Sequence, residues 1–236
     1  MRQFVLVPGA WHGAWCWQRV LPLLRATGHG AHAVTLTGVG DRAHLLDDRI
    51  RLQTHIDDVL AVVACEELTD VVLVGHSYAG MVITGAADAL LRSSPTPLTH
   101  LVYVDAVTPY PGESWSSQHA AEIVAARVQA ASATGGLALP PPDAGVFGLE
   151  GADRAWVTRR QTPHRQQTRH RQILPRRTGR TRRPNRQRTG RHRIPGHRQK
   201  PPGTTPASRQ GRRLGQHLRS LFRWHRMECP IRSWRD

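Results

Sequence analysis

The stretch that most constrains the fold is an apolar run that leads to a serine and continues as a helix. Residues 71–75 read Val-Val-Leu-Val-Gly, which is typical of a strand buried on both faces. Residues 78–91 are rich in Ala and Leu and are predicted to form a helix. Ser77 lies between them, with glycine or alanine at positions 75, 79 and 80. A serine on a sharp strand-to-helix turn with small neighbours is the usual setting of a nucleophilic serine; the alternative is an ordinary glycine-rich turn.

Other apolar runs are also typical of strands, and helical patterns separate them. The predicted strands are residues 4–7, 31–36, 71–75 and 100–104, and the predicted helices are 15–26, 54–65 (with Thr54 as its cap) and 78–91. This alternation predicts an α/β fold with a doubly wound parallel sheet. Ligands of such sheets bind at the carboxyl ends of the strands. Four residues follow those ends and are expected to surround the site: Ala10, Gly38, Ser77 and Asp105.

The pattern changes twice further along the chain. Residues 1–105 are predicted to form the core, and the proline-interrupted segment 106–160 is expected to form a helical lid over the pocket or, alternatively, an ordinary surface excursion. Residues 161–236 are rich in Arg, Gln, Pro, Thr, Gly and His and lack valine. Such a composition buries too little apolar surface to offset chain entropy, so this tail is predicted to be disordered.

The charge of the chain is divided unevenly. Residues 1–158 carry nine arginines and no lysine against 15 acidic residues, whereas residues 159–236 carry 24 basic residues against two acidic ones. The overall net charge of +16 therefore combines an acidic body with a strongly basic tail. An alternative function follows, in which a non-catalytic protein binds nucleic acid or other polyanions through the tail, without sequence specificity.

The cysteines and the hydropathy of the chain indicate its expected location and argue against a membrane protein. The three cysteines, Cys16, Cys65 and Cys229, suit neither a disulfide framework nor a zinc site, so a reducing, cytoplasmic location is expected. No stretch approaches the length of a membrane-spanning helix, and the N-terminal apolar run is too short for a signal peptide. The sequence predicts a protein that needs no cofactor or metal and does not enter a membrane.

Several motifs together resemble a known family. They are Phe4-Val5-Leu6-Val7-Pro8-Gly9-Ala10-Trp11-His12-Gly13, Leu36-Thr37-Gly38-Val39-Gly40-Asp41-Arg42, Gly75-His76-Ser77-Tyr78-Ala79-Gly80-Met81 and Val102-Tyr103-Val104-Asp105-Ala106. In this order they are similar to the α/β-hydrolase superfamily, and within it to the branch of small methylesterases and plant hydroxynitrile lyases. The resemblance runs from residue 3 to about residue 163.

The resemblance implies a serine hydrolase that cleaves small carboxylic (methyl) esters by acyl-enzyme chemistry; lyase chemistry shares the scaffold. Ser77 matches the nucleophile, and the backbone N–H groups of Ala10 and Tyr78 match the oxyanion hole. Some hydrolases take their acid from the position of Asp105, which could instead be a structural loop cap.

The resemblance also implies that part of the machinery is missing. The family takes its acid and histidine from loops beyond the lid, where the basic tail stands, and the tail histidines, His164 among them, are expected to be disordered. His76 is expected to point away from Ser77. Activity is therefore predicted to be weak, and strand 100–104 is predicted to be an uncovered sheet edge. A reading-frame shift near codons 160–166 would explain the change. The hypothesis requires an acid loop, a Gly-His pair and an apolar helix in another frame of the gene.

Overall fold

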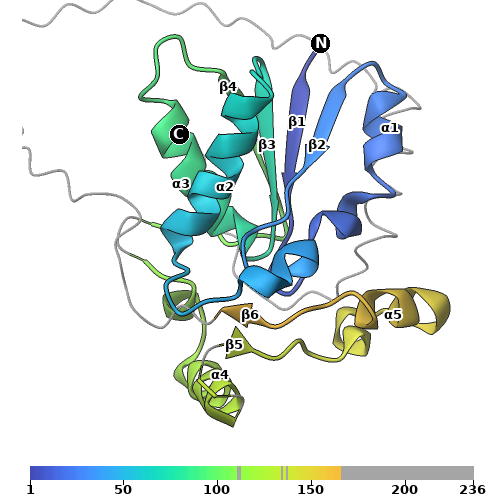
Figure 1. Cartoon of the computed structure of the whole chain (residues 1–236), viewed down its shortest axis with the longest axis vertical. Coiled ribbons are helices and arrows are strands. Elements are labelled where there is room, and N and C mark those ends of the chain that lie inside the picture. The colour runs from blue at the N-terminus through green and yellow to red at the C-terminus, as the bar shows by residue number, and fades with distance from the viewer. Residues whose placement is uncertain (111–112, 134, 137, 166–236) are drawn as a thin grey trace, which may run out of the picture.

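The computed structural model describes residues 1–110, 113–133, 135–136 and 138–165, and a four-stranded parallel sheet lies at their centre (Figure 1). Its strands are β1 (Gln3–Val7), β2 (Gly30–Ala33), β3 (Val71–His76) and β4 (Leu98–Val104), in the order β2-β1-β3-β4. The predicted doubly wound parallel sheet is confirmed. Because all four strands run the same way, the loops that follow them gather at one edge of the sheet.

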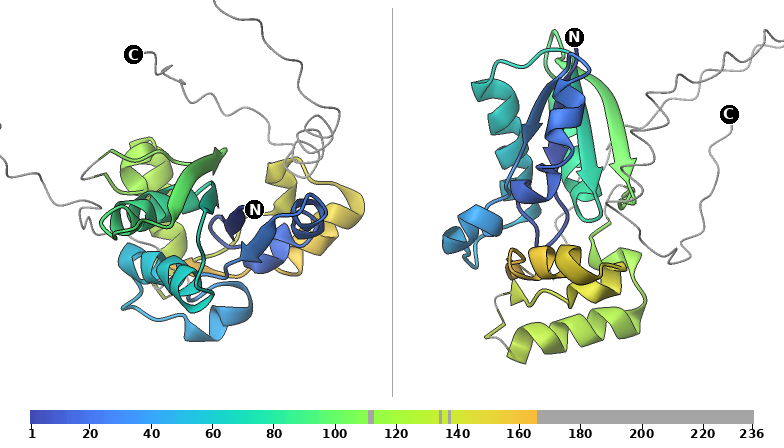
Figure 2. Two further views of the ribbon diagram at one scale, coloured as in Figure 1. Left: turned by 90° about the horizontal axis from the view of Figure 1, so that it is seen from above. Right: turned by 90° about the vertical axis from the view of Figure 1, so that its right-hand side faces the viewer.

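Helices cover both faces of the sheet (Figure 2). The 3₁₀ helix η1 (Ala14–Trp17) and α1 (Leu21–Arg25) pack on one face, and α2 (Leu52–Cys65) and α3 (Ala79–Leu90) pack on the other. The elements after β4 lie beyond the carboxyl ends of the strands, and the name lid is used below for the described part of residues 106–165, by position alone. These elements are η3 (Ser116–Gln118), α4 (Ala121–Ala133), β5 (Ala138–Leu139), η4 (Ala144–Phe147), α5 (Gly151–Thr158) and β6 (His164–Arg165). A further 3₁₀ helix, η2 (Gly40–Leu45), follows β2.

Alternating residues of each central strand enter two separate cores. Val5 and Leu73 pack toward α2 and α3, whereas Leu6 and Val72 pack toward η1 and α1. Each of these four side chains is at most 2% exposed. Burial on both faces is the reason why the central strands read as continuous apolar runs in the sequence.

Two predicted helices differ from the structure. Residues 15–26 form two short helices, η1 and α1, instead of one, and Pro22 stands in the first turn of α1, where a proline is well tolerated. Thr54 is not the cap of α2: the N-cap is Arg51, and the Thr54 hydroxyl, at the third helical position, accepts the Arg51 N–H at 3.1 Å.

β4 forms an exposed edge of the sheet. It pairs with β3 and with no other strand of the described residues. Leu101 and Val102, neighbours whose side chains point to opposite faces, are 37% and 39% exposed. β4 is therefore the last strand on this side of the described sheet, and the uncovered edge stays a prediction because residues 166–236 lie outside the described residues.

The predicted start of the tail, residue 161, lies a few residues too early in the sequence. Residues 161–165 belong to the folded body: β6 pairs antiparallel with β5, and His164 is fully buried. The expectation that His164 is disordered was wrong. The other residues of the predicted tail, 166–236, lie outside the described residues.

Candidate active site at the strand-to-helix turn

Ser77 occupies a strained turn between β3 and α3. Its φ of 53° lies in the left-handed region, which residues with a side chain rarely adopt. The surrounding backbone holds this conformation, because the Ser77 carbonyl accepts the N–H groups of Gly80 and Val107, both at 3.1 Å. Strain that the surroundings fix in this way clusters at functional sites.

Small residues allow the turn to close. A methyl group on Gly75 would come within 2.9 Å of the Ala79 carbonyl oxygen, and one on Gly9 would come within 3.0 Å of the Ser77 Cβ. Because Gly75 has no side chain, β3 and α3 can approach each other closely. Because Gly9 has none, the loop after β1 can lie against the serine. The predicted strand, turn and helix are confirmed here, and Ser77 is half-buried.

The predicted oxyanion-hole residues lie at the ends of two adjacent strands. Val7 pairs with Gly75, so the loop that carries Ala10 begins beside the turn that carries Ser77 and Tyr78. The Ala10 carbonyl accepts the Nδ1–H of buried His12 at 2.6 Å, which fixes the peptide unit between Ala10 and Trp11. Among the described residues no group accepts a hydrogen bond from the Ala10 N–H. A donor left open beside a serine is what an oxyanion hole requires.

The Tyr78 side chain points into the protein and bonds to His55. The Nε2 of His55 lies 3.0 Å from the Thr37 carbonyl, which can only accept, so Nε2 carries the proton. Its Nδ1 therefore accepts the Tyr78 hydroxyl proton at 2.9 Å. Burial lowers the pKa of His55, so the ring is neutral at physiological pH. Nothing in the sequence singled out His55 except its place on the apolar side of a helix.

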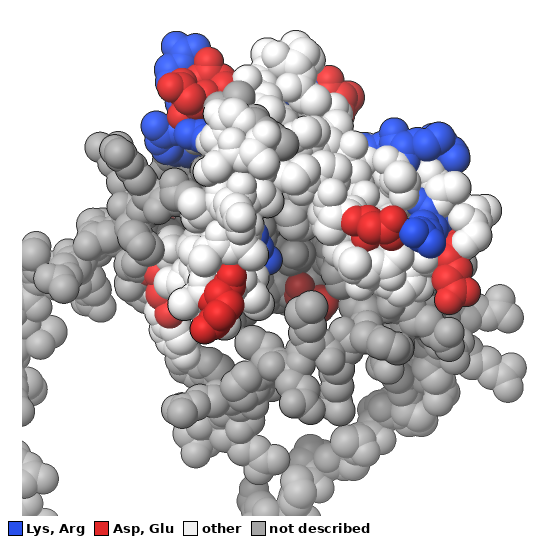
Figure 3. Space-filling model, turned by 90° about the horizontal axis from the view of Figure 1, so that it is seen from below, with Lys and Arg blue, Asp and Glu red and all other residues white. Residues whose placement is uncertain are grey.

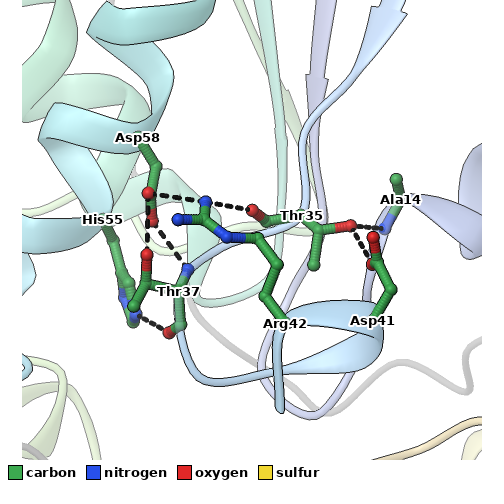
Figure 4. Close-up of polar contacts among 7 residues, drawn as sticks. All are labelled: Ala14, Thr35, Thr37, Asp41, Arg42, His55 and Asp58. Carbon is green, nitrogen blue, oxygen red and sulfur yellow. Dashed lines mark hydrogen bonds and ion pairs between the residues drawn. The ribbon is translucent and has the colours of Figure 1, made fainter. Parts of the chain in front are cut away.

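A polar network fixes the loop after β2 beside this pair (Figure 4). The Asp58 carboxylate accepts the Thr37 N–H at 2.7 Å, the Thr37 hydroxyl at 2.8 Å and the Arg42 guanidinium at 2.8 Å. The Thr35 hydroxyl accepts the Ala14 N–H at 2.9 Å and donates to Asp41 at 2.6 Å. The loops after β1 and β2 are thus tied together at the site, an arrangement that the sequence did not predict.

Asp105 follows β4 and has a left-handed φ of 43°. Its side chain is exposed, and among the described residues no hydrogen bond or ion pair reaches its carboxylate. The structure therefore brings the backbone of Asp105 near the turn, through the bond of Val107 to Ser77, but does not join its carboxylate to a histidine. Its role as the acid stays a prediction.

His76 adjoins the serine but faces away from it, as expected. It lines a cavity of about 50 Å³ together with His12, Trp15, Phe147 and Trp156, and Ser77 is not part of that lining. Burial, followed by the neighbouring His12, lowers the pKa of His76 to about 3. A histidine with so low a pKa is a weak proton acceptor.

His164 is a further buried imidazole near the turn. Its ring lies 4.8 Å from the ring of Tyr78, between centroids. Burial, followed by the nearby His55, lowers its pKa to about 3. Neither ring nitrogen forms a hydrogen bond of normal geometry with a described residue, so His164 is not bonded to the Ser77 hydroxyl.

The described surface near the lid carries little charge. Seen from the lid side, it is mostly uncharged, and its acidic and basic side chains are interspersed (Figure 3). Within the described ranges no group of three or more His, Cys, Asp or Glu side chains could hold a metal ion. No helix in those ranges has the length and apolar character needed to span a membrane.

Comparisons with known proteins agree with this geometry. A model described as the alpha/beta hydrolase family matches residues 4–230. The carbendazim hydrolyzing esterase of Nocardioides sp. (strain SG-4G) is 42% identical over 183 residues, which cover 74% of each chain. Methyl jasmonate esterase 1 of Vitis vinifera is 34% identical over 114 residues, which cover 47% of this chain and 41% of the plant protein.

A solved structure shows the same fold. The extracellular α/β-hydrolase from a Paenibacillus species superposes with a TM-score of 0.62 at 24% identity and covers 70% of this chain and 67% of its own. The family match extends over most of the sequence, and the bacterial esterase is similar over three quarters of both chains. The protein is therefore a member of the α/β-hydrolase family.

Proposed function

We propose that this protein is a carboxylic-ester hydrolase that acts on small esters, methyl esters among them, through Ser77. The observation that carries the proposal is the left-handed Ser77 at the carboxyl end of β3, beside the open N–H of Ala10. Relatives named as esterases, one bacterial and one from grapevine, support an ester as the substrate.

The proposed reaction begins with attack of the Ser77 hydroxyl oxygen on the ester carbonyl. The negative charge that develops on the carbonyl oxygen is stabilised by the backbone N–H groups of Ala10 and Tyr78. The alcohol then leaves, and water releases the acid from the acyl-enzyme. Asp105 is the candidate acid that would orient a histidine.

The proposed reaction also needs a general base that accepts the Ser77 proton. No hydrogen bond joins Ser77 to any of the four buried histidines among the described residues. His12 bonds to the Ala10 carbonyl, and His55 bonds to Tyr78 and to the Thr37 carbonyl. Burial lowers the pKa of both His76 and His164 to about 3. We therefore propose that the nucleophile and oxyanion hole act without an efficient proton acceptor from residues 1–165. In enzymes of this kind, loss of the histidine alone lowers kcat by about 10⁶-fold, so any turnover that begins at Ser77 is expected to be slow.

Hydrolysis of p-nitrophenyl acetate by the full chain tests the proposal. We expect slow turnover that Ser77→Ala removes, because the serine oxygen is the attacking atom. Ser93→Ala is the matched control, since this serine is exposed beyond the end of α3, and it should behave as the unchanged protein. Equal rates for the protein and Ser77→Ala would refute the nucleophile, and a fast turnover lost in Ser77→Ala would refute the missing base.

Two finer proposals accompany the ester chemistry. The free thiols of Cys16 and Cys65 support a reducing, cytoplasmic location. The alternative, a polyanion-binding protein, rests on the excess of basic residues in 159–236, nearly all of which lie outside the described residues. Binding to mixed-sequence DNA that weakens steeply with salt, without Ser77-dependent hydrolysis, would favour it.

A further inference from the structure

Two short segments of the lid meet beneath the carboxyl ends of β1 and β3. β5 and β6 form a two-stranded antiparallel sheet although 24 residues separate them in the sequence (Figure 2). The name strap is used below for residues 138–139 and 162–165. Each segment of the strap is bonded to the loop that carries Ala10.

Trp11, the residue after Ala10, is the main point of contact. Its indole Nε1–H donates to the Leu139 carbonyl at 3.2 Å, and its own carbonyl accepts the Thr162 N–H at 3.0 Å. Trp11 has a φ of 67°, a left-handed conformation that costs a bulky residue free energy. The strap therefore bonds to both the side chain and the backbone of the strained residue next to Ala10.

Thr162 makes a second connection. Its hydroxyl accepts the Gly40 N–H at 2.8 Å, in the loop after β2. Gly40 lies so close to the loop after β1 that a methyl group on it would come within 2.8 Å of the Gly13 Cα. One threonine therefore fixes both loops that border the site.

The strap also reaches the other half of the predicted oxyanion hole. His164 packs edge-on against the ring of Tyr78, with the Trp115 ring 6.1 Å away. The Tyr78 N–H is the second proposed donor. The strap therefore contacts the Tyr78 ring as well as Trp11, the residue after Ala10.

We infer that the strap positions the oxyanion hole, with Trp11 and Thr162 as positioning residues whose hydrogen bonds hold Ala10 in place. The lid then takes part in positioning the catalytic groups: the oxyanion hole is complete only while the strap is docked. This inference rests on the proposed function for the catalytic meaning of the Ala10 N–H, but the mechanical coupling can be measured without activity.

The test compares variants of the full chain that remove single bonds. Trp11→Phe keeps an aromatic ring but loses the bond to Leu139, and Thr162→Val keeps the shape but loses the bond to Gly40. Thr162→Ser retains the hydroxyl and should restore the behaviour of the unchanged protein. Asp143→Asn is the control, because it weakens an ion pair with Arg154 inside the lid that touches neither loop.

Amide hydrogen exchange of residues 9–12 is the first measurement. Loss of one hydrogen bond that holds the loop should speed this exchange about fivefold in Trp11→Phe and Thr162→Val. Unchanged exchange, or an equal increase in Asp143→Asn, overturns the inference, because the loop would then be independent of the strap or would sense only general loosening of the lid.

The second measurement is hydrolysis of p-nitrophenyl acetate. A displaced oxyanion donor should lower kcat by about 10- to 100-fold with little change in KM. Faster exchange with an unchanged kcat overturns the positioning role. If exchange is faster but hydrolysis does not depend on Ser77, the coupling of strap and loop stands and the proposed function fails.

Discussion

Replacing Gly80 by alanine is expected to destabilise the protein severely. A methyl group at this position would overlap the carbonyl oxygen of Val107 and come within 2.9 Å of its carbon. Val107 cannot move away freely, because its N–H donates to the Ser77 carbonyl at 3.1 Å. Since two backbone segments would have to separate, we expect a loss of about 3 kcal/mol or more in the free energy of unfolding.

Urea unfolding followed by circular dichroism measures this loss. Gly28→Ala is the control: Gly28 also lacks a side chain, with a φ of 78°, but no atom lies within 4 Å of the added methyl group. Gly28→Ala should lower the free energy of unfolding by only about 1 kcal/mol, from backbone strain alone. Similar midpoints for Gly80→Ala and the unchanged protein would show that the loop after β4 is not packed on the start of α3.

Acidification is expected to unfold the protein before its carboxylates titrate. The pKa values of His76 and His164 fall to about 3 through burial, and burial also lowers those of His12 and His55. Because these pKa values lie below that of an unfolded histidine, about 6.5, only the unfolded chain takes up protons as the pH falls. Stability should therefore be lost from about pH 6.5 down toward pH 3. Between pH 7 and 4 the loss should be about 3 kcal/mol for each of His76 and His164.

The pH dependence of urea midpoints checks this window, and His164→Phe isolates one contributor. The variant keeps a ring against Tyr78 and removes two ring nitrogens without normal hydrogen bonds, so it should be at least as stable at pH 7. Its loss of stability on acidification should be smaller than that of the unchanged protein. If the urea midpoints of His164→Phe and of the unchanged protein fell equally with pH, His164 would take up its proton in the folded protein as readily as in the unfolded chain.

The strained turn and the sheet could be predicted because their signals are local. The run of residues 71–75, the small residues beside Ser77 and the alternation of strands with helices each specify one structure. The sequence also predicted that Ala10 lies near this turn, because the carboxyl ends of parallel strands meet at one edge of a sheet. The absence of an efficient general base stays a prediction, because residues 166–236 lie outside the described residues, although no hydrogen bond joins a described histidine to Ser77.

The strap and the Tyr78–His55 pair could not be predicted for a different reason. β5 and β6 have two residues each, too few to show alternation, and each depends on a partner far along the chain. His164 was assigned to the tail because composition averages over a long window and misses a few ordered residues at its start. The hydrogen bond of His55 to Tyr78 joins positions 23 residues apart through tertiary packing, so no local pattern reports it.

The contact between the lid and the loop after β1 also gives the protein an intrinsic optical signal. The rings of Trp11 and Trp115 meet edge to face, with centroids 6.1 Å apart, and they belong to the loop and to the lid respectively. Two indoles held this close and at a fixed angle are expected to couple their electronic transitions and to give a paired band in the ultraviolet circular dichroism spectrum. Undocking of the lid would abolish that band, so its motion could be followed spectroscopically in the unlabelled chain.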